Sequence, residues 1–237
     1  MEILCIASYL SCNHPFTLYT YTPQDASMLY LTERLQLHKN FSNFSIKNAN
    51  EIVSQDKIFF DNRGEVGIAA FSDYIRYYIL YKEGGWWVDT DTICVQNLKS
   101  LDMPFVFASE RQKDGSIIPT TCVIKAPKGS PMLLKIIQEM EQIISDKKNR
   151  AGRLKLENIL RFNFPIKVKW GIIGPLFLGD FIVRHKLENY VVDAKYFCDI
   201  NWFETKNFIT PHTKITINKD IYIYISSLEC YVVRFTT

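Results

Sequence analysis

The chain has 237 residues, of which 47% are hydrophobic and 22% are charged. That length can bury one sizeable core, so we expect a single domain over residues 1–237. A net charge of +3 does not indicate the basic surface typical of nucleic-acid-binding domains. No run of about 18 apolar residues predicts a membrane span, and no signal peptide is evident, so we expect a cytoplasmic protein. The six cysteines form no C-x-x-C pair, which argues for reduced thiols and against a zinc site.

Helix-like and strand-like segments alternate from the first residues onward, which is typical of an α/β domain with a mostly parallel central sheet. The patterns predict helices over Ile3–Leu10 and Gln24–His38, strands over Phe16–Tyr21 and Ile58–Phe60, a loop over Phe41–Phe44, and a short helix or turn over Ala49–Val53.

The stretch from Phe71 to Val95 is the most informative part of the sequence. Ser72 is a predicted N-cap for a helix that ends at Gly84-Gly85. Trp86 to Val88 then read as a strand, and Asp89-Thr90-Asp91 follows at its C-terminal end. Open α/β sheets bind their ligands at this end of the strands.

Asp89 and Asp91 are two carboxylates at positions i and i+2 around a bend, and they can point the same way. Mg²⁺ and Mn²⁺ prefer such oxygen ligands and leave room for substrate phosphates. A nucleotide diphosphate would complete the coordination shell. The alternative is structural, because D-x-D is common in turns, where Asp caps and bends the backbone.

Asp73 and Arg76 are three residues apart on the preceding helix and therefore lie on one face. Asp can accept hydrogen bonds from sugar hydroxyls, and Arg offers donors to phosphate or hydroxyl oxygens. Trp86 and Trp87 could add an apolar platform for a sugar or a base. The alternatives are an exposed ion pair and two tryptophans that simply belong to the core.

The run from Ser72 to Asp91, SDYIRYYILYKEGGWWVDTD, resembles the signature of the DXD-containing sugar-binding family of glycosyltransferases. The tandem tryptophans, with LCIASYL and FTLYTY upstream, most resemble a bacterial branch that glycosylates capsule and lipopolysaccharide. Further stretches that resemble family landmarks are FVFASE, Ala126–Pro131 and Trp170–Pro175.

The resemblance implies a GT-A-like fold, a UDP-sugar or less often a GDP-sugar donor, and Mn²⁺ or Mg²⁺ as the cofactor. By position, Asp73 and Arg76 would hold hydroxyls of the donor sugar. Asp89 would contact ribose and sugar, and Asp91 would be the direct metal ligand. Trp87 would pack beside the donor. Gly174-Pro175 would shape the loop near the transferred sugar and the acceptor.

The sequence departs from the family pattern in two places. Members of this branch have a strand before the helix that LCIASYL resembles, whereas this sequence starts at Met1-Glu2-Ile3. Near the other end, the family usually offers a His and a Trp at the site, where this chain has Ile225–Tyr231. Glu229 and Ser227 are the candidate replacements as oxygen ligands.

Residues 145–170 carry eight basic residues against two acidic ones. Residues 147–169 could therefore attract an anionic lipid surface or an anionic glycan. The alternative is a solvated face of a helix and loop, which we favour.

Together these features predict a metal-dependent glycosyltransferase that moves a hexose from a nucleotide diphosphate sugar to a carbohydrate acceptor, which could be a glycan, a glycolipid or a protein. Resemblance implies retention of the anomeric configuration. A non-catalytic nucleotide-sugar or glycan-binding protein is the main alternative, because of the two departures from the family. A nucleotidyltransferase ranks lower, because the N-terminal region has no Gly-rich phosphate loop.

Overall fold

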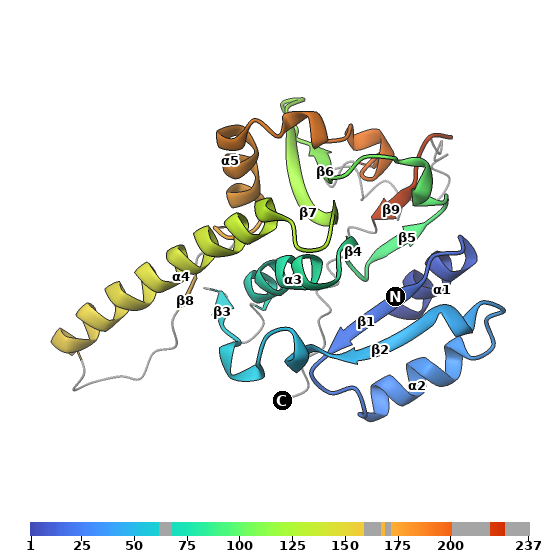
Figure 1. Cartoon of the computed structure of the whole chain (residues 1–237), viewed down its shortest axis with the longest axis horizontal. Coiled ribbons are helices and arrows are strands. Elements are labelled where there is room, and N and C mark those ends of the chain that lie inside the picture. The colour runs from blue at the N-terminus through green and yellow to red at the C-terminus, as the bar shows by residue number, and fades with distance from the viewer. Residues whose placement is uncertain (62–67, 159–166, 169–171, 201–218, 226–237) are drawn as a thin grey trace.

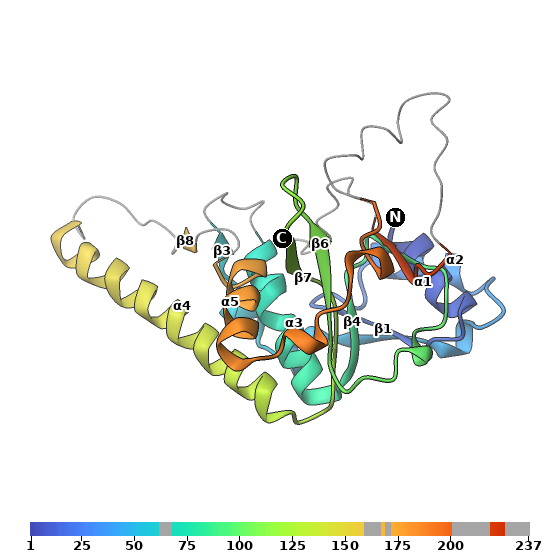
Figure 2. The same cartoon turned by 90° about the horizontal axis from the view of Figure 1, so that it is seen from above.

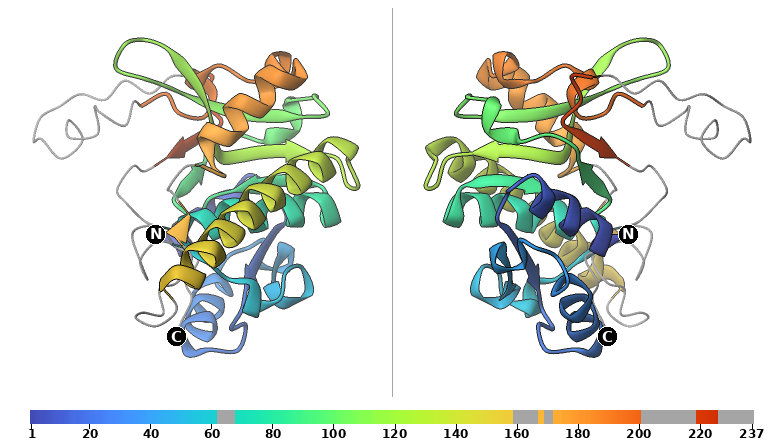
Figure 3. Two further views of the ribbon diagram at one scale, coloured as in Figure 1. Left: turned by 90° about the vertical axis from the view of Figure 1, so that its left-hand side faces the viewer. Right: turned by 90° about the vertical axis from the view of Figure 1, so that its right-hand side faces the viewer.

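The computed structural model describes residues 1–61, 68–158, 167–168, 172–200 and 219–225. It is a mixed α/β arrangement in which helix α3 lies centrally, between the β1–β2 pair and the sheet that contains β6 and β7 (Figure 1). The side views in Figure 3 separate the same three parts. The predicted mixed α/β class is confirmed.

The N-terminal part consists of two helices and a pair of parallel strands. Its elements are α1 (Glu2–Ser11), β1 (Phe16–Thr20), α2 (Ala26–Leu35) and β2 (Phe44–Asn48). Helix α2 begins where the Asp25 side chain accepts a hydrogen bond of 2.8 Å from the backbone N–H of Met28. The predicted first helix, first strand and second helix are confirmed, with the second helix shorter at both ends. Strand β2 was not predicted.

Helix α3 (Ala69–Glu83) leads through a glycine turn into β4 (Gly85–Val88). Gly84 has φ +72°, and a Cβ there would lie 2.6 Å from the backbone nitrogen of Lys128. Only glycine fits that backbone conformation and that close approach, so the helix stops here as predicted. Ser72 is not the N-cap, because the helix already begins at Ala69 and Ser72 lies in its first turn.

The largest sheet is antiparallel and has the strand order β4-β7-β6. Strands β6 (Val106–Arg111) and β7 (Ile117–Ala126) form a hairpin around Gly115, which has φ +84°. The predicted mostly parallel central sheet is therefore not confirmed. The described parallel ladders are the β1–β2 pair and a short pair of β3 (Phe60–Asp61) and β8 (Lys167–Val168). Two strands joined by a hairpin pair antiparallel. We predicted no strand after Val95, so the hairpin of β6 and β7 was not expected.

The remaining described elements flank this sheet. Strands β5 (Thr92–Cys94) and β9 (Ile223–Ile225) form a separate antiparallel pair. The long helix α4 (Pro131–Asn158) packs along α3 and extends to one side of the molecule, and α5 (Pro175–His185) packs against β7 (Figure 2). None of the helices in the described part of the chain is long and apolar enough to cross a membrane.

Apolar side chains cover both faces of the β4-β7-β6 sheet. Because successive residues of a strand point to opposite faces, Phe107 and Ile124 contribute to a cluster with α3, α4 and α5. Val106 and Val123 contribute to a second cluster with α1 and α2. Both faces are thus fixed by packing, and the C-terminal end of β4 is held firmly beside α3.

Candidate functional site

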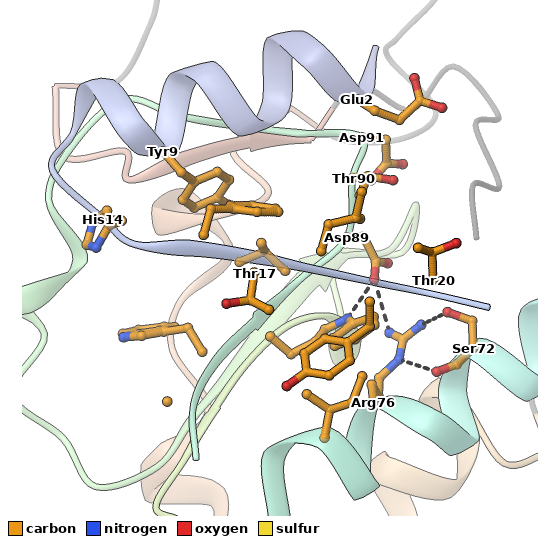
Figure 4. A pocket seen from close by; sticks show the side chains of 18 of the residues that line it. Glu2, Tyr9, His14, Thr17, Thr20, Ser72, Arg76, Asp89, Thr90 and Asp91 are labelled. Atoms are coloured by element: carbon orange, nitrogen blue, oxygen red, sulfur yellow. Dashed lines mark hydrogen bonds and ion pairs between the residues drawn. The ribbon is translucent and has the colours of Figure 1, made fainter. Parts of the chain in front are cut away.

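A groove of about 1210 Å³ runs along β4 and is lined by α3, by β1 and by the turn that follows β4 (Figure 4). Within the described residues, β1 pairs only with β2 and β4 pairs only with β7. In the part of the chain that the structure describes, each strand therefore has one edge without a neighbouring strand. Consecutive residues of both segments, 15–20 and 84–91, line the groove. This volume is enough for a ligand of nucleotide-sugar size.

The groove brings together most of the residues that the sequence singled out. Those that line it are Asp73, Arg76, Trp86, Trp87, Asp89, Thr90, Asp91 and Pro175. Gly174 lies directly behind Asp73. Glu229 and Ser227 lie outside the described residues, so their predicted role as ligands stays a prediction.

Backbone contacts fix the turn that carries the two aspartates. The N–H of Asp89 donates to the carbonyl of Cys122 on β7 at 2.9 Å, which continues the β4–β7 pairing by one residue. The carbonyl of Asp89 accepts hydrogen bonds from both the N–H (3.3 Å) and the hydroxyl (2.7 Å) of Thr92. The Tyr9 hydroxyl of α1 forms a hydrogen bond of 3.0 Å with the Thr92 hydroxyl. Asp89 and Asp91 are thus presented on an anchored turn between two strands.

Arg76 is the central cation of the site. Its side chain is only 4% exposed, and its nitrogens lie 3.2 Å from Asp73 Oδ1 and 3.4 Å from Asp89 Oδ1. It also donates to the carbonyl and hydroxyl of Ser72, each at 3.1 Å, and to the carbonyl of Thr121. Figure 4 shows the guanidinium between Ser72 and Asp89. We call Asp73, Arg76, Asp89 and Thr121 the Arg76 cluster.

Trp87 contacts both partners of the Arg76–Asp89 ion pair. The carbon of the Arg76 guanidinium lies 5.1 Å from the centroid of the Trp87 ring, within the range of a cation–π interaction. The indole N–H donates to Asp89 Oδ1 at 2.8 Å. Trp87 therefore holds both partners of the ion pair. Trp86 instead packs edge-on against Phe197.

Asp73 is held in place by contacts with Arg76, Thr121 and Gly174. Its Oδ1 accepts a hydrogen bond of 2.9 Å from the Thr121 hydroxyl in addition to the contact with Arg76. Its Oδ2 packs against Gly174 so closely that a Cβ at position 174 would collide with it. Gly174 immediately precedes α5, whose N-terminal end favours a nearby negative charge. The alternative of an exposed Asp73–Arg76 pair is wrong, because the two side chains are 9% and 4% exposed.

Burial governs the protonation of the two aspartates in the turn. It raises the pKa of Asp89, and the charge of Arg76 and the hydrogen bond from Trp87 oppose that increase. Burial, followed by the negative charge of Asp89, raises the pKa of Asp91 to about 7. The negative charge of one carboxylate disfavours the ionised form of its neighbour.

A divalent cation would relieve this repulsion. The carboxylate oxygens of Asp89 and Asp91 match the hard ligands that Mn²⁺ and Mg²⁺ prefer. The described residues contain no group of three or more metal-binding side chains. The carboxylates of Asp89 and Asp91 fit such a cation, which would take its remaining ligands from water and from a bound diphosphate.

Two further contributors to the site were not predicted from the sequence. Ser72 provides its carbonyl and hydroxyl to Arg76, and Thr121 contacts both Arg76 and Asp73. Thr121 lies 48 residues from Asp73, on a strand that sequence patterns did not identify. Spacing within α3 could have suggested Ser72, since it lies one helical turn before Arg76.

The side chains of the basic stretch, residues 147–169, lie outside the described part of the structure. The backbone of residues 147–158 forms the last turns of α4. Contact with an anionic lipid surface, the alternative that we did not favour from the sequence, is not supported.

Comparisons with known proteins point to the same region. Residues 10–108 match the family model described as "Glycosyltransferase sugar-binding region containing DXD motif". This match covers fewer than half of the residues but includes Asp73, Arg76, Asp89 and Asp91, and it supports a role in glycosyl transfer.

Among solved structures, the chain is similar to "PaToxG Glycosyltransferase", at 17% identity and a TM-score of 0.46. That alignment covers 78% of this chain and 62% of the other, so the chain spans less than two thirds of that structure. No curated protein matches the sequence significantly.

Proposed function

We propose that the chain transfers a hexose from a nucleotide diphosphate sugar, with UDP as the favoured nucleotide, to a carbohydrate hydroxyl. The observation that carries this proposal is the buried contact of Arg76 with both Asp73 and Asp89 at the C-terminal end of β4, inside a groove of nucleotide-sugar size. The family match over residues 10–108 supports the same reaction class.

The proposed roles follow from the position of each side chain along the groove. Asp91 and the outward part of Asp89 would hold Mn²⁺ or Mg²⁺, which neutralises the charge that develops on the departing diphosphate. Asp89 can contact the cation and Arg76 at the same time. Its Oδ1 contacts Arg76 and Trp87, yet its side chain is still 32% exposed.

The donor sugar would lie against Asp73, Arg76 and Trp87, with Gly174-Pro175 at the side from which the acceptor arrives. Arg76 is the residue best placed to fix these groups, since it is in contact with two acidic side chains and one indole ring. Preorganised charges of this kind stabilise a transition state without rearranging during the reaction. The sequence resembles enzymes that retain the anomeric configuration, which favours retention here. Its resemblance to a branch that glycosylates capsule and lipopolysaccharide favours a bacterial glycan or glycolipid as the acceptor.

The test is an assay of UDP release from a panel of UDP-hexoses, with Mn²⁺ and after its removal by a chelator. We expect release that depends on the metal and that Asp91→Asn reduces by about 100-fold or more, as expected when a group that stabilises developing charge is lost. Asp102→Asn is the matched control, because Asp102 is exposed and does not line the groove.

Metal-independent release, or full activity of Asp91→Asn, would refute the proposed metal site. Calorimetric binding of UDP and UDP-sugars without release or transfer to any of a broad set of acceptors would instead favour the non-catalytic binding protein. The wild-type chain and Asp91→Asn should be compared in both measurements, so that loss of binding is separated from loss of turnover.

A further inference from the structure

Strand β7 is irregular where it passes the Arg76 cluster. Phe107 of β6 lies opposite Ile124 of β7, but Ser109 lies opposite Pro119. A step of two residues along β6 thus corresponds to five along β7, so β7 bulges between Pro119 and Ile124. Bulges of this kind often re-aim side chains beside a functional site.

The bulge carries Thr121 to the ion pair in the interior. Its hydroxyl donates to Asp73 Oδ1 at 2.9 Å, and its carbonyl accepts a hydrogen bond from Arg76. Thr121 is itself buried. One residue of β7 therefore contacts both partners of an ion pair on α3.

The next residue of β7 contacts the turn with the two aspartates. The carbonyl of Cys122 accepts the backbone hydrogen bond of Asp89, and Arg76 reaches the Asp89 side chain. Gly174 lies so close to Asp73 that any larger residue at position 174 would collide with the carboxylate. Thr121 and Cys122, two consecutive residues of β7, thus connect α3 to the Asp89–Asp91 turn.

We propose that Thr121 is a positioning residue of the nucleotide-sugar site: its hydroxyl fixes Asp73, Asp73 fixes Arg76, and Arg76 fixes Asp89. This inference deepens the proposed function and rests on it for its catalytic consequence. Its structural consequence holds for any ligand, because the contacts are already present in the protein alone.

The structural consequence is tested first, by amide hydrogen exchange. Thr121→Val keeps the shape of the side chain and removes the hydroxyl, and Thr121→Ser keeps the hydroxyl. A hydrogen bond to a buried charge is worth enough to change a local equilibrium by about 10- to 100-fold. We therefore expect amides 89–92 to exchange about tenfold faster or more in Thr121→Val, and near the wild-type rate in Thr121→Ser.

The control is Thr32→Val, which removes a hydroxyl that bonds a carbonyl one turn earlier in α2 and does not line the groove. We expect it to leave exchange at residues 89–92 unchanged. Unchanged exchange in Thr121→Val, equal exchange in the Val and Ser variants, or faster exchange throughout the protein would each overturn the proposal.

The catalytic consequence is tested by kinetics and calorimetry. In Thr121→Val we expect kcat/KM for transfer to fall about 10- to 100-fold, while affinity for UDP alone changes less than about twofold, because UDP lacks the sugar that the cluster would contact. Thr121→Ser should recover most of the loss. A parallel loss of UDP affinity, or no recovery in the Ser variant, would overturn the role at the donor sugar. If the wild-type chain neither binds nor turns over any UDP-sugar, the proposed function fails, and the exchange data still decide whether Thr121 positions Asp89.

Discussion

Arg76→Met is the substitution whose effect on stability the structure specifies most sharply. It replaces a side chain that is 4% exposed, with acidic neighbours 3.2 and 3.4 Å away, by an apolar chain of similar length. The substitution leaves Asp73 in the interior and removes the cation that lies 3.2 Å from its Oδ1. Breaking a buried ion pair by removing one partner destabilises proteins by about 3–5 kcal/mol, mostly because an uncompensated charge is left behind.

The measurement is urea unfolding followed by circular dichroism, supported by thermal unfolding. For a chain of this size each kcal/mol lowers the melting temperature by about 2–4 °C, so Arg76→Met should melt about 6–20 °C below wild type. Asp89 should also become harder to ionise, because Arg76 is a cause that holds its pKa down against burial.

Arg184→Met is the matched control at the surface. Arg184 lies 2.7 Å from both Glu139 and Asp180, but its side chain is 43% exposed. Exposed pairs contribute about 0–1 kcal/mol, since water already solvates both charges. Both arginines thus have two acidic partners, but Arg76 is buried and also contacts Ser72, Thr121 and Trp87.

The double variant Asp73→Asn/Arg76→Met separates lost packing from an uncompensated charge. Because the buried carboxylate is gone, the double variant should be more stable than Arg76→Met alone. Equal losses in Arg76→Met and Arg184→Met, or a double variant less stable than the single one, would refute the reasoning that burial of charge dominates here.

Two further predictions concern His14 and Gly84, which line the groove outside the Arg76 cluster. Burial lowers the pKa of His14, whose Nε2 accepts a hydrogen bond of 3.0 Å from the backbone N–H of Leu98. The folded state then binds fewer protons than the unfolded state, so the free energy of unfolding should fall as the pH drops below 6.5, the ordinary pKa of histidine. Glutamine can accept the same hydrogen bond but does not titrate. His14→Gln should therefore flatten this pH dependence in urea titrations from pH 7.5 to 5. Gly115→Ala should destabilise the protein by about 1–2 kcal/mol, because Gly115 has a positive φ. Gly84→Ala should cost more, about 2 kcal/mol or above, because Gly84 has a positive φ and position 84 also lacks space for a Cβ. Equal losses in the two variants would show that the close approach to Lys128 is unimportant.

The sequence predicted the local part of the site well, for a physical reason. Apolar spacing, the glycine pair and the apolar strand lie within one continuous run, so helix α3, the turn at Gly84 and strand β4 follow from short-range rules. The two aspartates then necessarily come at the end of β4. Neighbours on one helix turn also predicted the Asp73–Arg76 pair, although not its burial.

The parts that depend on distant segments could not be predicted in this way. Pairing of β4 with β7 decides that Thr121 meets Asp73, and no pattern near either residue indicates it. Strand β2 has the alternation expected of a strand, but over only five residues, which is too short a run to identify against a loop. The start of α3 was placed four residues late, because the predicted N-cap was Ser72 and the observed one is Ile68. Serine is a common N-cap residue, but here the Ser72 hydroxyl accepts a hydrogen bond from Arg76.

The arrangement of charge at the groove is explained better by a ligand than by stability. Buried ion pairs can often be replaced by packed apolar residues without loss of stability, so stability alone gives no reason to keep the Asp73–Arg76 pair in the interior. The exposed fraction of the side chain increases from 4% for Arg76 to 9% for Asp73 and 32% for Asp89. The two most buried charges therefore lie behind an aspartate that still faces the groove. Asp91 follows on the same turn, with a pKa of about 7 that binding of a cation would lower. A purely structural ion pair needs no such gradation, whereas a site that must present fixed carboxylates to a cation and a diphosphate does.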